Sequence, residues 1–71
     1  MANSTMPEKS LSMLEDILGA ESMAVKKYHF FTANCTDPNL KMICEKAEQM
    51  HRKHFDTMFQ YLNSHACQGG M

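Results

Sequence analysis

Three side chains in this sequence have the chemistry to bind one metal ion together: Glu21, Glu48 and His51. Glu48 and His51 form a Glu-x-x-His pair, and residues three apart on a helix project from the same face. Carboxylate oxygens and imidazole nitrogens together suit iron, manganese or zinc. All three residues interrupt an apolar helical seam, where an unpaired charge is costly to bury. Their types and spacing therefore indicate a metal site.

Two long helices would have to position these residues. Apolar residues recur at alternating steps of three and four in two stretches, which predicts helices over about 10–33, capped by Ser10, and about 38–64. Between them, Asp37 can cap a helix and Pro38 suits its first position. The short connection makes the helices antiparallel. We therefore predict one hairpin over residues 10–65, with flexible tails at 1–9 and 66–71. The two seams are Leu11, Leu14, Leu18, Val25 and Tyr28, then Leu40, Cys44, Phe55, Met58 and Leu62.

The three candidate ligands also fall at one depth along this hairpin. At 1.5 Å per residue, Glu21 lies about 22 Å before the middle of the turn, and Glu48 and His51 lie about 19 and 23 Å beyond it. Tyr28, two turns after Glu21, could donate a hydrogen bond to a ligating carboxylate. His54 is a weaker candidate: a slightly rotated seam would point it inward, but the main seam favours a position on the flank or the surface.

A single hairpin leaves many of these apolar residues without a partner. A large exposed apolar face marks an interaction surface, and two-fold pairing is the commonest solution. We therefore predict an all-α fold in which two copies of the antiparallel helical hairpin, paired either parallel or antiparallel, form a four-helix bundle as a homodimer. Two copies would supply four carboxylates and two imidazoles, the ligand set of ferritin-like di-iron and di-manganese bundles. The expected cofactor is di-iron, and manganese or zinc would accept the same ligands.

Composition excludes several other classes of protein. The chain has 71 residues, is 44% hydrophobic and carries a net charge of −1, which predicts one small domain. It has no basic stripe for nucleic acid and no apolar run near the roughly 20 residues of a membrane span. The first residues do not form a secretory signal, so we expect an intracellular protein. Cys35, Cys44 and Cys67 lack the paired spacing of a zinc site. We expect Cys44 to be buried and the other two thiols exposed.

Over about residues 11–63, the sequence resembles the spore coat protein F family of endospore-forming bacteria. The resemblance implies a ferritin-like hairpin or bundle associated with the spore coat, with Glu21, Glu48 and His51 at the ligand positions. Its expected function is a di-metal centre between two hairpins, with oxidase-type or peroxidase-type redox activity if the centre is active. The segments that carry the resemblance are Leu14-Glu15-Asp16-Ile17-Leu18, Glu21, Lys26-Lys27-Tyr28, Asp37-Pro38-Asn39-Leu40-Lys41 and Glu48-Gln49-Met50-His51.

Simpler interpretations stand beside this one. Glu48 could form a surface ion pair with Arg52, four residues on, and His51 could be a partly buried histidine. The protein would then be a structural coat subunit without turnover. Cys35 and Cys67, at opposite ends of the hairpin, could link it to further copies or to other coat proteins. The eight methionines allow a third hypothesis, a copper carrier, although at helical spacing they suit a core or an interface better.

Overall fold

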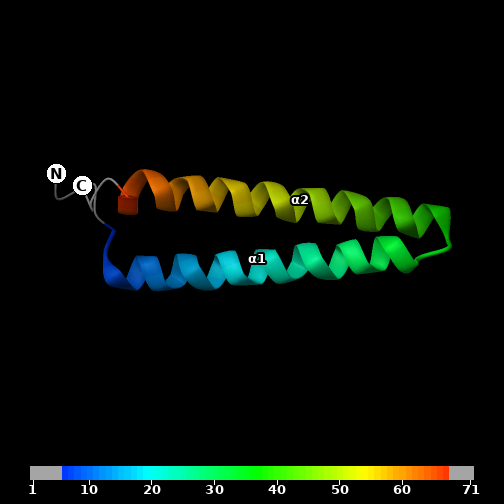
Figure 1. The fold of residues 1–71 in the computed structure, drawn as a ribbon, viewed down its shortest axis with the longest axis horizontal. Coiled ribbons are helices and arrows are strands. Elements are labelled where there is room, and N and C mark those ends of the chain that lie inside the picture. Colours follow the sequence, from blue (N-terminus) through cyan, green and yellow to red (C-terminus); the bar gives the residue numbers. More distant parts are fainter. Residues whose placement is uncertain (1–5, 68–71) are drawn as a thin grey trace.

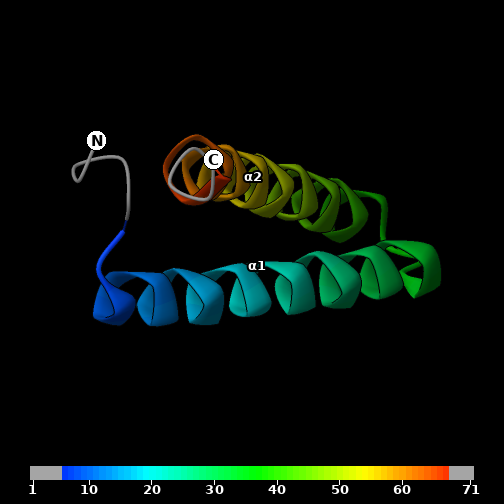
Figure 2. The same cartoon turned by 60° about the vertical axis from the view of Figure 1, so that its left-hand side comes forward.

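Two long helices make up most of the molecule. The computed structural model describes residues 6–67, with side chains as far as His65. Helix α1 runs Glu8–Asn34, helix α2 runs Pro38–Leu62, and the π-helical turn η2 continues α2 over Asn63–Cys67. The helices lie side by side and antiparallel, joined at one end (Figures 1 and 2). The predicted all-α helical hairpin is confirmed.

The start of α2 follows the prediction from Asp37 and Pro38. The Asp37 side chain caps the helix by accepting hydrogen bonds from the backbone N–H groups of Asn39, at 2.9 Å, and Leu40, at 3.2 Å. Pro38 occupies the first turn, where its missing N–H has no helical partner to lose. Only residues 35–37 separate the helices, so the turn is tight enough to force the antiparallel arrangement.

The start of α1 differs from the prediction. Ser10 does not cap the helix, because α1 already begins at Glu8 and the residue before it, Pro7, makes no side-chain capping bond. The helical hydrogen bonds start from the Pro7 carbonyl, which accepts from the N–H of Leu11 at 2.9 Å. Glu8 in the first turn is favourable beside the positive end of the helix dipole. The predicted tail at 1–9 is therefore too long by two residues.

The interior of the hairpin is narrow. Among the described residues, the buried apolar side chains are Leu14 and Cys44, one from each helix. The molecule measures 52 × 16 × 13 Å and has a radius of gyration of 15.8 Å, against roughly 11 Å for a compact chain of this length. Each helix covers one stripe of the other, and most apolar side chains outside that stripe stay exposed.

The two broad sides of the hairpin differ in chemistry. At 100° per residue, the large apolar side chains beside the interior stripe fall on the same side in both helices. Grooves on that side are lined by Met13, Ile17 and Tyr61 and, nearer the turn, by Phe31 and Leu40. We call it the apolar face, and its members are Met13, Ile17, Ala20, Ala24, Phe31, Leu40, Ile43, Ala47, Met50, His54 and Tyr61. The opposite side, the polar face, carries Ser22, His29, Glu45, Gln49 and Arg52, with Val25 and Phe55 in the groove beside Ser22 and Arg52.

Two of the three cysteines can be located. Cys44 is buried, as predicted. Cys35 is half-buried in the turn rather than exposed, and its thiol lies 3.5 Å from the Asp37 carbonyl oxygen. The side chain of Cys67 lies outside the described residues. In the described part of the chain, neither helix combines the length and the apolar character that crossing a membrane requires.

Candidate metal centre

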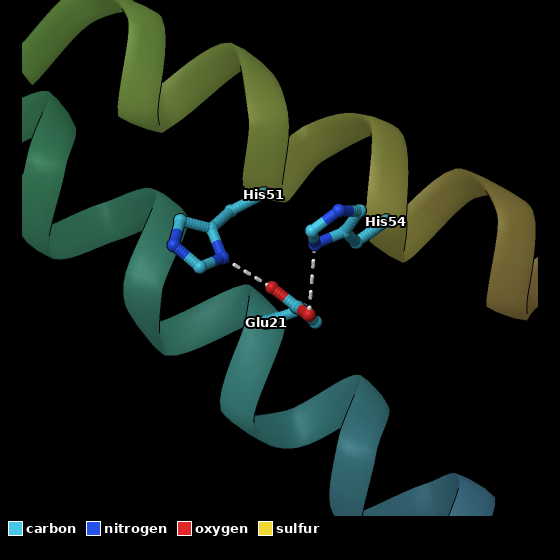
Figure 3. A group of neighbouring side chains, drawn as sticks. All are labelled: Glu21, His51 and His54. Atoms are coloured by element: carbon cyan, nitrogen blue, oxygen red, sulfur yellow. Dashed lines mark hydrogen bonds and ion pairs between the residues drawn. The ribbon is translucent and has the colours of Figure 1, made fainter.

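The middle of the hairpin holds a cluster of one carboxylate and two imidazoles. Glu21 is the central residue of α1, and His51 and His54 follow the centre of α2 by one and four residues. Figure 3 shows both imidazoles of α2 directed at the Glu21 carboxylate across the gap between the helices. Their possible ligand atoms all lie within 4.8 Å of one another. The helices thus bring three metal-ligand side chains to one point.

Each oxygen of Glu21 has its own imidazole partner. His51 Nδ1 lies in hydrogen-bond contact with Oε1, and His54 Nδ1 lies 3.2 Å from Oε2. An ionised carboxylate can only accept hydrogen bonds, so each imidazole donates from Nδ1. The Glu21 side chain is 18% exposed and that of His51 23%, whereas His54 is 47% exposed. The cluster is therefore closed toward the hairpin interior and open on the His54 side.

The two imidazoles lower the pKa of Glu21. The hydrogen bond from His51 is the main cause, partial burial acts in the opposite direction, and the charge and hydrogen bond of His54 add to the lowering. Both contacts favour the ionised carboxylate, which is the form that binds metal. Glu21 is thus ionised in the folded chain down to a lower pH than an ordinary glutamate.

Aromatic rings fix the orientation of His51. The Tyr28 ring stacks on the His51 ring with centroids 5.5 Å apart and planes 10° from parallel, and the His54 ring meets His51 edge-on at 5.8 Å. Tyr28 itself meets Phe31 edge-on at 6.1 Å. Tyr28 was expected to donate a hydrogen bond to a carboxylate. Its described contacts are instead through its ring, so it acts on the position of the imidazole.

Glu48 lies apart from this cluster. Its Oε2 accepts from Arg52 Nε at 3.1 Å and Nη2 at 2.9 Å, and His29 Nδ1 lies 3.3 Å away. The Arg52 hydrogen bonds are the main reason that the pKa of Glu48 is lowered, with partial burial opposing them and His29 adding to the effect. Arg52 and His29 belong to the polar face. The carboxylate of Glu48 is therefore turned to the other side of the hairpin from His54.

The structure thus brings Glu21 and His51 together at one depth, as the sequence predicts, but places His54 in the cluster and Glu48 outside it. The signal for His54 was present, because Ile43, Ala47, Met50 and His54 follow one another at steps of four and three. That stripe runs along the apolar face beside the interior seam. His54 therefore points toward both the interior and the exposed apolar face.

The three possible ligand atoms lie within 4.8 Å of one another, and one of their separations is close to that between two ligands of a single ion. With metal–ligand bonds of about 2.1 Å, ligand atoms around a tetrahedral ion lie about 3.4 Å apart. The 3.2 Å separation of His54 Nδ1 and Glu21 Oε2 is close to that value. An ion between them would replace the present hydrogen bonds, and each imidazole would then carry its proton on Nε2. Two imidazoles and one carboxylate are a set that both zinc and ferrous iron accept.

The fold and the cluster define a helical hairpin that carries a carboxylate and two imidazoles at its centre. No protein-family model and no solved structure matches the chain. The chain is 30% identical over 70 residues to the uncharacterized protein YuzM of Bacillus subtilis (strain 168). The aligned segment covers 99% of this chain and 86% of YuzM. The chain therefore belongs to the same family as YuzM.

Proposed function

We propose that this protein is a metal-binding homodimer, a four-helix bundle of two hairpins, in which Glu21, His51 and His54 of each chain bind iron, with more imidazoles and fewer carboxylates than a ferritin-like centre. The observation that carries the proposal is the cluster itself: a half-buried carboxylate with one imidazole on each oxygen. Two imidazoles and one carboxylate with open positions are typical of ferrous iron sites. Bound iron would supply one-electron redox chemistry with dioxygen or peroxide.

The exposed surface supports pairing with a second copy. The chain exposes 5541 Å², about 1,000 Å² more than the roughly 4,500 Å² expected for a compact protein of 8.1 kDa. A standard interface buries about 800 Å² on each partner, so one such interface would absorb most of the excess. The apolar face offers the side chains for it, including Met13 at 58%, Ile43 at 61% and Tyr61 at 51% exposed.

The position of the cluster favours a shared centre. Glu21 is the midpoint of α1, and His54 belongs to the apolar face. A two-fold axis through the middle of that face would bring the two clusters together in either orientation. An axis along the hairpin pairs the two copies parallel, and an axis across it pairs them antiparallel. The dimer would then supply two carboxylates and four imidazoles to a pair of ions, and the partner would close the open side at His54. Association with the spore coat is part of the proposal and rests on the sequence resemblance.

Metal content per chain tests the proposal. The full-length protein is loaded anaerobically with ferrous ion, passed through a desalting column and analysed for iron by elemental analysis. We expect one iron per chain, lost in Glu21→Gln and His54→Gln. Lys53→Gln, which neutralises an exposed charge next to His54, serves as the matched control and should keep the metal. Wild-type protein that retains no iron, zinc or manganese would reject the metal site and leave the structural coat subunit as the function.

A further inference from the structure

Glu48 combines an inward position with an outward contact. Its side chain is only 14% exposed, comparable to Glu21, and it lies three residues before His51 on α2. That spacing puts it on the same face as His51, within reach of the cluster by rotation of its side chain. Its carboxylate nevertheless accepts hydrogen bonds on the polar face, away from the cluster.

Arg52 is the main cause of that orientation. It reaches Glu48 Oε2 with two nitrogen atoms, Nε at 3.1 Å and Nη2 at 2.9 Å, from one turn further along the same helix. His29 adds a contact at 3.3 Å from α1. Three nitrogen atoms thus surround one oxygen of Glu48. Among the described residues no comparable contact draws Glu48 toward Glu21 or His51.

We infer that Arg52 is a specificity-determining residue, which withholds Glu48 from the metal centre and keeps its ligands to Glu21, His51 and His54. The inference rests on the proposed metal site and names what sets its selectivity. Imidazole ligands favour zinc, cobalt and ferrous iron, while added carboxylates favour harder ions such as manganese. Freeing Glu48 would add a carboxylate, so Arg52 biases the site against manganese.

A double-variant experiment tests this with Co²⁺ and Mn²⁺ as probes. Affinities of the full-length protein are measured by calorimetric titration at one protein concentration, with Co²⁺ absorption as a second readout of the ligand number. In the wild-type background, Glu48→Gln should leave Co²⁺ affinity and spectrum unchanged. Arg52→Gln should raise Mn²⁺ affinity relative to Co²⁺ by about twofold to fivefold, the range that release of a surface ion pair allows. Adding Glu48→Gln to Arg52→Gln should abolish that gain, and Lys53→Gln should not produce it.

The outcomes separate this inference from the proposed function. If Glu48→Gln alone weakens Co²⁺ binding tenfold or more, Glu48 is already a ligand and the inference is overturned while the metal site stands. An unchanged ratio of Mn²⁺ to Co²⁺ affinity in Arg52→Gln also overturns it. If the wild-type protein binds neither probe, or if Glu21→Gln binds them equally well, the metal site and the role of Arg52 fall together. Arg52 is largely exposed, and circular dichroism of each variant verifies that the helices are intact.

Discussion

Met50 and Met42 offer a matched test of the proposed dimer face. Both lie on α2 and are similarly exposed, at 48% and 51%, but Met50 belongs to the apolar face and Met42 points to the outer side of the helix. We expect Met50→Glu to dissociate the dimer and Met42→Glu to leave it intact. The two residues share their type and their helix and are similarly exposed. A difference between the two variants in dimer dissociation would therefore come from the face on which each residue lies.

The structure sets the size of the effect. Full burial of a methionine contributes about 1.5–3 kcal/mol, and roughly half of the Met50 side chain remains to be covered, which gives about 1 kcal/mol per copy. A two-fold interface loses this twice, so the dimer is weakened by about 2 kcal/mol, or about 30-fold in dissociation constant. Burying a glutamate there costs more still, which makes 30-fold a lower bound.

Sedimentation equilibrium over a concentration series measures this directly. The dissociation constants of the wild type, Met50→Glu and Met42→Glu are compared in one buffer without added metal, so that metal binding does not contribute. Equal weakening by both variants would show that the apolar face is not the interface. A wild-type chain that sediments as a monomer at every concentration would refute the argument from exposed area altogether.

Three further predictions concern stability, each measured as the free energy of unfolding in urea at one fixed protein concentration. Gly19→Ala should stabilise the chain by about 0.5–1 kcal/mol, because a Cβ there meets nothing within 4 Å and helical glycine carries an entropic cost; a loss of stability would contradict the open environment. Thr32→Val should stabilise by about 1 kcal/mol, because the buried Thr32 hydroxyl oxygen has no described hydrogen-bond partner; destabilisation would reveal one. The pKa of Glu21 is lowered by His51, so its stabilising contribution is present above the ordinary glutamate pKa of about 4.3 and lost as the pH falls through the lowered value. Between pH 6 and pH 3 the wild type should therefore lose more stability than Glu21→Gln, and parallel losses would contradict the contact.

The hairpin could be predicted because its signals are local. Asp37 and Pro38 define the start of α2 through capping and a fixed backbone angle, and the alternating apolar spacing determines which stripe of each helix is covered. The start of α1 was missed because a serine suits a cap only if the helix begins there. Pro7 ends the non-helical segment three residues earlier, and its carbonyl accepts the first helical hydrogen bond.

The candidate site could be predicted only in part from the sequence. The meeting of Glu21 and His51 could be predicted, because the rise and twist of a helix determine both the face and the depth at which each residue lies. Whether Glu48 turns toward His51 or toward Arg52 is a choice of side-chain rotamer. Periodicity carries no information on it, because both partners are one turn away. His54 was ranked lower because it lies between two overlapping seams.

In the proposed metal centre, the arrangement of charges within the hairpin would set the selectivity. Two carboxylates occupy inward positions on facing helices, and each is compensated by different groups. Glu21 has two imidazoles, which could exchange a proton for a metal ion. Glu48 has mainly the guanidinium of Arg52, which cannot bind a metal ion, with the imidazole of His29 beside it. On the proposal, a cation would find one carboxylate whose partners are both imidazoles and one that is held mainly by a fixed positive charge, which repels the cation. On this proposal, the group that neutralises each acid would decide where a metal binds, more than the presence of the acid in the seam.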